Sequence, residues 1–284
     1  MSNKKHTLST EEMIRLYQEG VNANKIAEIA GYKTGKSVLD KLHKAGVTVR
    51  TSKESKHLLR TYQEDLFEHI DAAWKGYFVG LMLTDGWVTQ DRTVGYSSTD
   101  KDVVEYLSNM TGKSIQYVYR PDEKMGPRGK MIHCNPEYRL TFSSKTMIEN
   151  LIRLGIVHNK SKILQGPELT PNEYKYIRFI LRGIIDGDGT LGFPSNAPAS
   201  MYFRIVSASE DFIDWCIWAL EILGMTDLRK RKATESIWEV NTCQPCNIAI
   251  LATAIYAEKM GMKRKRDKIR NHFFNYTTAA LSSN

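Results

Sequence analysis

Two aspartates, Asp85 and Asp188, end two segments of similar sequence, and a pair of carboxylates in matched positions suits metal-assisted chemistry. The segments are FVGLMLTDG at 78–86 and LRGIIDGDG at 181–189, which lie 103 residues apart. Each is predicted to be a helix that ends at its aspartate, with the following glycine as a left-handed cap. A carboxylate at a helix C-terminus faces the negative end of the helix dipole, which costs roughly 0.3–1 kcal/mol.

The same two helices carry small residues that would let them pack against each other. Gly80 and Gly183 are each followed four residues later by a small residue, Thr84 or Gly187, and such a face allows two helix backbones to approach closely. Pairing would bring the two aspartates together, where they would repel and raise one another's pKa. Divalent cations would remove this cost, because carboxylates, backbone carbonyls and water form a site suited to Mg²⁺ or Mn²⁺.

The segments that follow the two helices also match in kind, which indicates an internal duplication. Each copy is predicted to contain the elements αββαββα, and we place the halves at residues 73–170 and 171–284. Asp186 has no acidic counterpart in the first copy, where Leu83 stands at the equivalent place. We interpret Asp186 as structural or auxiliary.

The two aspartate-ending segments resemble the motifs of LAGLIDADG homing endonucleases, and the resemblance covers about residues 73–276. It implies an α+β fold in which two pseudo-symmetric αββαββα halves form a saddle over the DNA major groove. It also implies that Asp85 and Asp188 are the catalytic acids and that the backbone carbonyls of Thr84 and Gly187 help to bind the metal ions. The implied reaction is hydrolysis of one phosphodiester in each strand, leaving staggered ends.

That family also uses a basic residue near the end of each half, to stabilise the charged phosphorane or to position water. In the first half the sequence NKS is similar to the family's RKS, so we favour Lys160 over Lys162. In the second half KRKRDKI offers Lys265, with Arg266 and Lys268 as alternatives, because a single gap shifts the alignment by one residue.

The predicted strands carry polar and aromatic residues that suit contacts with base edges. Some must face the helices instead, because side chains alternate along a strand. The candidate DNA contacts are Arg92, Tyr96, Gln116, Tyr119, Arg120 and Arg139 in the first half, and Arg204, Arg229, Arg231, Trp238 and Asn241 in the second.

Residues 1–50 are predicted to form a small all-α domain. Ser9 and Glu12 have capping-box spacing, and a glycine ends each of three helical segments. The pattern resembles the helix-turn-helix of resolvases and invertases, which implies DNA contacts from the third helix. The alternative is a small helical bundle with a solvated lysine face. The candidate contacts of this helix are Lys36, Ser37 and Lys41.

Residues 51–72 are predicted to be a linker between this domain and the first half. The stretch TSKESKHLLR is polar and basic, and QEDLFEHIDAA is predicted to form a short helix. The basic stretch either follows a phosphate backbone or is a plain solvated linker.

The charge and the hydropathy of the chain indicate which classes of partner it binds. The net charge of +8 over 284 residues favours a polyanion, no apolar run approaches the ~20 residues that span a bilayer, and the N-terminus lacks a signal peptide. We therefore expect a cytoplasmic monomer, or one in a nucleoid or organelle, that binds double-stranded DNA and no membrane. The C-x-x-C of Cys243 and Cys246 is interpreted as reduced thiols, with a zinc site that recruits His133 and Cys134 as the alternative.

The resulting hypothesis is a freestanding or intron-encoded homing endonuclease that cuts one long, asymmetric DNA site. The alternatives are an RNA splicing maturase of the same family and a catalytically silent, DNA-binding transcription regulator. Retention of both acids argues against the regulator, and the helix-turn-helix pattern favours duplex DNA over RNA.

Overall fold

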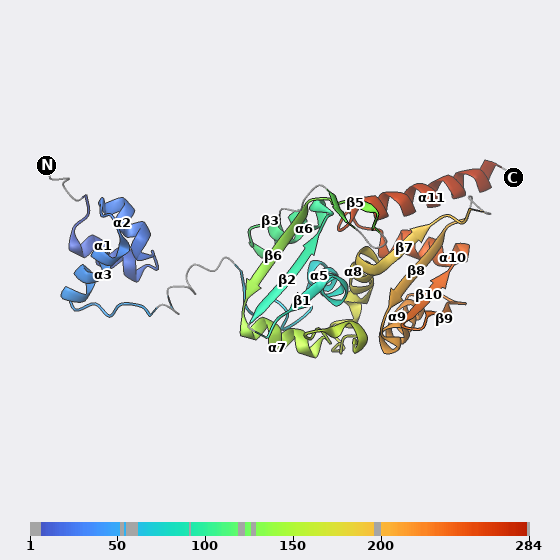
Figure 1. The fold of residues 1–284 in the computed structure, drawn as a ribbon, viewed down its shortest axis with the longest axis horizontal. Coiled ribbons are helices and arrows are strands. Elements are labelled where there is room, and N and C mark those ends of the chain that lie inside the picture. The colour runs from blue at the N-terminus through green and yellow to red at the C-terminus, as the bar shows by residue number, and fades with distance from the viewer. Residues whose placement is uncertain are drawn as a thin grey trace. The chain divides into compact units, whose positions relative to one another are not determined.

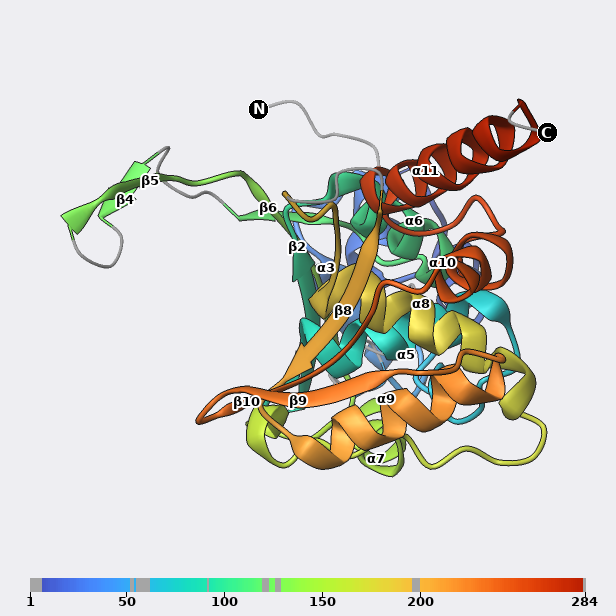
Figure 2. The ribbon, with the colours of Figure 1, turned by 90° about the vertical axis from the view of Figure 1, so that its right-hand side faces the viewer.

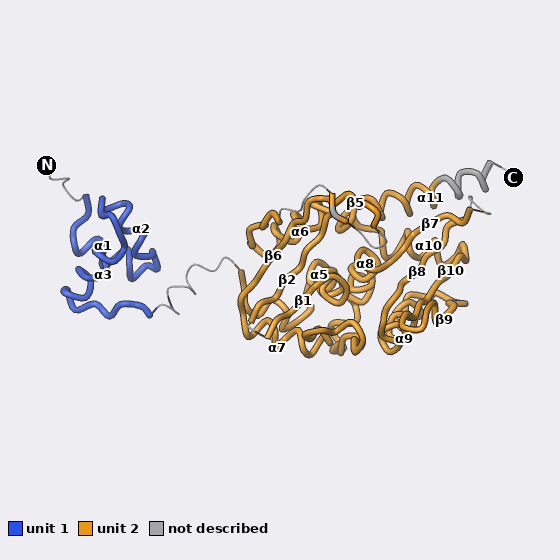
Figure 3. The backbone as a smooth tube through the Cα atoms, viewed as in Figure 1, with its two compact units in different colours: residues 1–61 blue, residues 62–284 orange. Residues whose placement is uncertain are grey.

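The chain divides into two compact units, Met1–Thr61 and Tyr62–Asn284 (Figure 3). The computed structural model describes residues 7–51, 54, 62–90, 92–118, 123–125, 129–195 and 200–282, with the side chains of the last helix described to residue 274. Among these residues there is no helix both long and apolar enough to cross a membrane.

Unit 1 contains the helices α1 (Thr10–Gln18), α2 (Ala23–Ala30) and α3 (Gly35–Lys44). α1 begins with the predicted capping box, in which the Ser9 side chain accepts from the Glu12 amide and the Glu12 carboxylate accepts from the Ser9 amide. The three helices enclose a small core of their own, made of Met13, Tyr17, Ile26, Ala27, Ala30, Val38 and Leu42.

Unit 2 contains two halves with the same order of elements (Figure 1). The first half has α5 (Ala73–Thr84), β1 (Gly86–Val88), β2 (Thr93–Ser98), α6 (Lys101–Thr111), β3 (Gln116–Val118), β6 (Glu137–Ser143) and α7 (Lys145–Arg153). The second half has α8 (Ile177–Asp188), β7 (Gly189–Gly192), β8 (Tyr202–Ser207), α9 (Glu210–Ile222), β9 (Arg229–Thr234), β10 (Ile237–Thr242) and α10 (Pro245–Ile250). The antiparallel sheets have matching orders, β1-β2-β6-β3 and β7-β8-β10-β9, which confirms the predicted α+β fold of two pseudo-symmetric αββαββα halves.

Several elements were not predicted. A hairpin of β4 (Glu123–Met125) and β5 (Met131–His133) is inserted between β3 and β6. The last predicted helix of the second half is α10 followed by a π-helical segment, η4 (Leu251–Ile255), and a further helix, α11 (Lys263–Ser282), comes after it. Two short 3-10 helices, η2 (Lys160–Lys162) and η3 (Tyr174–Tyr176), lie on either side of the connection between the halves.

The short helix predicted within QEDLFEHIDAA is wrong, because residues 64–68 form turns. Leu66, Phe67 and Ile70 are nevertheless buried in the core of unit 2. The Ile70 amide donates to the Glu173 carboxylate at 2.8 Å. This segment therefore packs its apolar side chains on the core of unit 2. Its Ile70 amide forms a tertiary hydrogen bond in place of the one that a helix would have provided.

The helices α5 and α8 lie side by side between the two sheets (Figures 1 and 2). Side chains alternate along each strand, so each sheet has one face packed on helices and one outer face turned away from them. In the second sheet Phe203, Ile205 and Val240 are buried in the core. Their neighbours along β8 and β10, Arg204, Glu239 and Asn241, therefore belong to the outer face.

Candidate active site

The helices α5 and α8 meet backbone to backbone at Gly80 and Gly183. A Cβ built on either glycine would lie 2.8 Å from the Cα of the other, which is closer than real Cβ atoms approach a backbone. A Cβ on Gly187 would collide with the Thr84 side chain and lie 3.1 Å from Oδ2 of Asp85. Close approach therefore requires these small residues, and it places the Asp85 carboxylate against the last turn of α8.

The glycines that follow the two aspartates are not left-handed caps, so that part of the prediction is wrong. Gly189 has extended backbone angles, φ −77° and ψ 146°, and Gly86 has no positive φ. β1 and β7 begin at these glycines. A Cβ on Gly86 would lie 2.5 Å from Met82 Cα, and one on Gly189 would lie 2.7 Å from Ile185 Cα. Glycine is required because each strand turns directly back over the last turn of its helix.

Asp85 and Asp188 are exposed on the side that faces solvent, while the protein surrounds them on the others. This partial burial raises the pKa of Asp188 to about 6, with repulsion by Asp85 as the next cause and attraction by Lys160 and Lys265 opposing it. Burial also raises the pKa of Asp85, again against the two lysines. The two acids are thus close enough to repel, as the pairing of the helices predicts.

Lys160 lies at the end of α5. Its side chain is buried, and Nζ donates to the carbonyl oxygens of Thr84 at 3.2 Å and Gly86 at 2.5 Å. These are the residues on either side of Asp85. Burial lowers the pKa of Lys160, while the two aspartates act to raise it.

Lys265 takes the equivalent position at the end of α8. Its buried Nζ donates to the carbonyl oxygens of Gly187 at 3.5 Å and Gly189 at 2.6 Å, the residues on either side of Asp188. It also donates to the carbonyl oxygens of two residues in the last turn of α8, at 2.6 and 2.8 Å. Burial lowers the pKa of Lys265 to about 8.

The two alternatives to Lys265 point elsewhere. Arg266 forms an ion pair with its neighbour Asp267 at 3.3 Å, and Lys268 donates to the Leu191 carbonyl at 2.6 Å. Lys265 is therefore the residue whose position matches that of Lys160.

The oxygen atoms at the two helix ends fit a divalent cation. The carboxylates are oxygen donors open to solvent, and the carbonyls of Thr84 and Gly187 accept only long hydrogen bonds from the lysines, 3.2 and 3.5 Å. No described group of three or more His, Cys, Asp or Glu side chains is placed to hold a metal ion. A cation bound here would keep several water or phosphate oxygens, which is the usual coordination of Mg²⁺ in proteins.

Asp186 is fully buried, and its side chain does not reach the solvent as those of Asp85 and Asp188 do. Its carboxylate connects α5, α8 and the segment just before α11. Lys265 lies in the first turn of α11. The Asp186 carboxylate accepts hydrogen bonds from the Tyr77 hydroxyl at 2.9 Å, the Tyr256 hydroxyl at 2.7 Å, the Met262 amide at 2.9 Å and Arg182 Nε at 3.2 Å.

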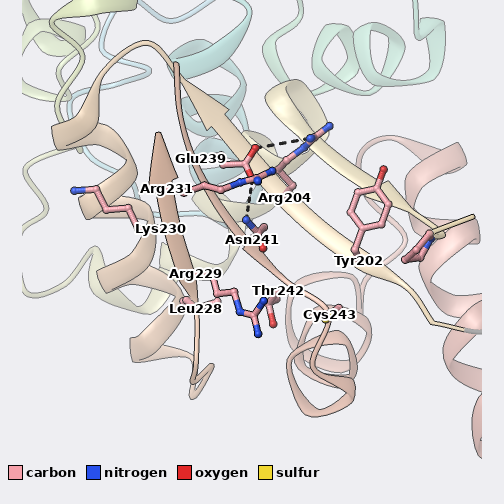
Figure 4. A pocket seen from close by; sticks show the side chains of 11 residues that line it. Tyr202, Arg204, Leu228, Arg229, Lys230, Arg231, Glu239, Asn241, Thr242 and Cys243 are labelled. Carbon is pink, nitrogen blue, oxygen red and sulfur yellow. Dashed lines mark hydrogen bonds and ion pairs between the residues drawn. The ribbon is translucent and has the colours of Figure 1, made fainter. Parts of the chain in front are cut away.

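Four of the five candidate contacts in the second half gather on the outer face of its sheet. They line a pocket of about 770 Å³ on that face (Figure 4). Trp238 does not belong to this group. It packs on the core with Lys230 and Lys232 over its ring, at 5.0 and 5.5 Å from the centroid. The four that gather are Arg204, Arg229, Arg231 and Asn241.

The candidate contacts of the first half are more dispersed. Gln116 is exposed and Arg139 is half-buried, with the Arg139 guanidinium 5.1 Å from the Trp87 ring centroid and 3.1 Å from the Glu137 carboxylate. Arg92 is exposed in the turn between β1 and β2, with a left-handed φ of 78°.

The prediction of Tyr96 as a DNA contact is wrong. The residue is fully buried, because it shares the helix-facing side of β2 with Val94. Tyr119 and Arg120 lie outside the described residues. In unit 1, Lys36 is exposed on α3 while Ser37 and Lys41 are half-buried.

Two features of the site are not among the residues that the sequence predicts. Glu239, which is almost fully buried on the outer face of the second sheet, binds two of the arginines. Arg264 forms a two-pronged ion pair with Asp100 at 2.8 and 3.1 Å, which joins the two halves beside Lys265. A signal for Glu239 existed in the strand IWEVNT, where a charged residue stands among apolar ones.

No protein-family model and no curated protein sequence matches this chain. Solved structures with a similar fold include the LAGLIDADG meganuclease I-AabMI bound to uncleaved DNA (12% identity, covering 75% of this chain and 92% of that chain, TM-score 0.44). Others are the LAGLIDADG homing endonuclease I-GzeII in complex with its DNA target (12%, 73% and 91%, 0.46) and the N-terminal LAGLIDADG domain of DUF199/WhiA (12%, 72% and 92%, 0.44). This similarity concerns the arrangement of helices and sheets alone.

Proposed function

We propose that this chain is a site-specific DNA endonuclease of the LAGLIDADG homing type, which hydrolyses one phosphodiester bond in each strand and leaves staggered ends. One observation carries the proposal. The lysines Lys160 and Lys265 bind the backbone on either side of Asp85 and Asp188, respectively. Two copies of one carboxylate-lysine arrangement at adjoining helix ends suit a duplex substrate, which offers two similar bonds to cleave.

Each half would contribute its own part of the reaction. Asp85 with the Thr84 carbonyl, and Asp188 with the Gly187 carbonyl, would hold the divalent cations, which when bound supply charge stabilisation and activation of water. An ammonium group beside the scissile phosphate stabilises the negative charge that develops there. With a pKa of about 8, Lys265 is mainly charged at neutral pH and suits this role.

Double-stranded DNA is the proposed partner of both units. The pocket on the second sheet places three arginines and an asparagine on one outer face, which combines charge for phosphates with groups that read bases. We propose that unit 1 adds affinity through α3 and takes no part in cleavage. Asp85 and Asp188 lie in one chain, so a monomer would suffice to cut both strands.

The test is incubation of the protein with a randomised duplex library, in Mg²⁺ and in a chelator. We expect staggered cuts at one long site with Mg²⁺ only. Asp85→Asn and Asp188→Asn should each abolish double-strand cutting and leave binding intact. Asp211→Asn is the matched control, because Asp211 is an exposed carboxylate on α9.

Three results would contradict the proposal. Full double-strand cutting by either active-site variant would remove the aspartates from the reaction. Cutting in the chelator would remove the cation. Tight binding to intron RNA with no cut duplex from the wild type would favour the splicing maturase.

A further inference from the structure

The outer face of the second sheet contains a carboxylate with an unusual set of neighbours. Glu239 is 1% exposed although it belongs to the solvent-facing side of β10. Its Oε1 accepts from Arg231 Nε at 2.6 Å and from Asn241 Nδ2 at 2.8 Å, and its Oε2 lies 3.8 Å from Arg204 (Figure 4). One carboxylate on β10 therefore connects side chains from β8, β9 and β10.

This contact dictates how the Asn241 amide is turned. A carboxylate ion-paired with two arginines offers only acceptors, so Asn241 must direct its NH₂ group toward Glu239. Its Oδ1 then points away from Glu239, and among the described residues only the Nδ2 atom of this side chain takes part in a hydrogen bond. Since Asn241 lines the pocket, the pocket contains a carbonyl acceptor with fixed orientation.

We propose that Asn241 selects a base that carries an exocyclic amino group in the major groove, adenine or cytosine, and that Glu239 is the positioning residue that keeps it so turned. The inference rests on the proposed function, since it names the feature of DNA that this pocket reads. Adenine N6 and cytosine N4 are donors, whereas guanine O6 and thymine O4 are acceptors. An acceptor facing an acceptor leaves both without a hydrogen bond.

The first half has no such arrangement at the equivalent positions. β1 pairs with β2 through Gly86 and Tyr96, and β7 pairs with β8 through Gly189 and Ile205. Following this register across the sheets, Glu239 corresponds to Arg139 and Asn241 corresponds to Thr141. The fixed amide therefore belongs to one half, which makes the two half-sites chemically different.

The experiment is selection of bound duplexes from a randomised library by the full chain, without cleavage, followed by sequencing. We expect one position to prefer adenine or cytosine over guanine or thymine by roughly tenfold. Asn241→Ala should erase this preference at that position alone. Glu239→Gln should reduce it to within about twofold, because the carboxamide can turn its NH₂ group toward Asn241 once the exposed Arg231, which shares Oε1 with Asn241, moves into solvent, and the Asn241 amide then turns over.

A double variant provides a test that a purely structural role would not pass. In Glu239→Gln/Asn241→Asp the donor and the acceptor of this hydrogen bond are exchanged, so an acceptor again points into the pocket and the preference should return. Glu137→Gln is the matched control. It alters a buried carboxylate that binds an arginine on the other sheet, and it should leave this position unchanged.

The outcomes separate the two proposals. If the wild type enriches no duplex at all, the proposed function fails and the inference fails with it. If the wild type enriches a site but Asn241→Ala changes no position, or Glu239→Gln keeps the full preference, only the inference is overturned. If Glu239→Gln does not fold, Asn241→Ala and the double variant still decide.

Discussion

The contact between Gly80 and Gly183 allows a quantitative test of how the two halves are joined. A methyl group added at Gly80 would lie 2.8 Å from Gly183 Cα and 2.9 Å from the Ile184 amide nitrogen, and closer still to the Ile180 carbonyl oxygen. All three obstacles are backbone atoms of α8, which cannot rotate away as a side chain would. Gly80→Ala must therefore push the two helices apart.

The expected magnitude is the difference of two opposing effects. Alanine is favoured over glycine in a helix by about 1 kcal/mol. Overpacking in a core typically costs about 1–3 kcal/mol, and rigid backbone obstacles place this site at the upper end. We expect a net loss of about 2 kcal/mol or more in the free energy of unfolding, which corresponds to about 4–8 °C in Tm for a unit of this size.

Gly76→Ala is the matched control, because Gly76 lies on the same face of α5 but has more room. A Cβ there would lie 3.2 Å from Phe179 Cβ and 3.3 Å from the Tyr176 carbonyl. Small shifts relieve such contacts, so this variant should stay within about 1 kcal/mol of the wild type.

The assay is urea or thermal unfolding followed by tryptophan fluorescence. All five tryptophans of the chain lie in unit 2, so the signal reports on the unit that contains the interface. If Gly80→Ala unfolded at the same point as the wild type or later, as helix propensity alone predicts, the helices would not be in rigid backbone contact at this position.

Two further predictions concern stability and DNA affinity. Burial opposes ionisation of Glu173, but hydrogen bonds from Arg153, Ile70 and Thr170 outweigh it and lower its pKa to about 2. The pKa of this carboxyl is thus lower in the folded protein than in the unfolded chain, where it is near 4.5. Its ionisation therefore stabilises the folded state by about 3 kcal/mol at pH values above 4.5, and this stabilisation is lost as the pH falls toward 2. Glu173→Gln should therefore lower the free energy of unfolding most at pH 6, and equal stabilities at pH 6 would contradict this account. In unit 1, Lys36→Ala/Lys41→Ala should weaken duplex binding and reduce the salt slope by about 2, whereas Lys25→Ala, which removes a lysine paired with Glu28, should not.

The two similar halves could be predicted from the sequence because they depend on local patterns that occur twice. Two segments with the same small residues and the same terminal aspartate predicted the pairing of α5 and α8, and the structure has this pairing. The role of Gly86 was inferred wrongly for a physical reason. Glycine permits a left-handed cap and also permits close approach, and only the path of the next strand distinguishes the two.

The sequence predicts less well which strand residues point outward, because the face to which a side chain of a short strand points depends on the strands that pair with it. The sequence predicts Tyr96 as a DNA contact, yet its strand turns the side chain into the core. Glu239 was overlooked because its burial is stabilised by arginines from two other strands. The choice among the basic residues after Met262 was open for a similar reason, since the length of the preceding loop sets which side chain reaches the end of α8.

The two halves position their equivalent lysines, Lys160 and Lys265, by different contacts. This difference distinguishes the arrangement that the two halves share from the contacts that only support it. In the second half, the buried Asp186 binds the Met262 amide and so fixes the chain just before Lys265. In the first half Leu83 stands in place of Asp186, and the residue before Lys160, Asn159, adopts a left-handed φ of 56°. Both routes deliver an ammonium group to the carbonyls that flank an aspartate. Because the supports differ while this arrangement is the same, the arrangement at the helix ends is the part that the proposed cleavage would need.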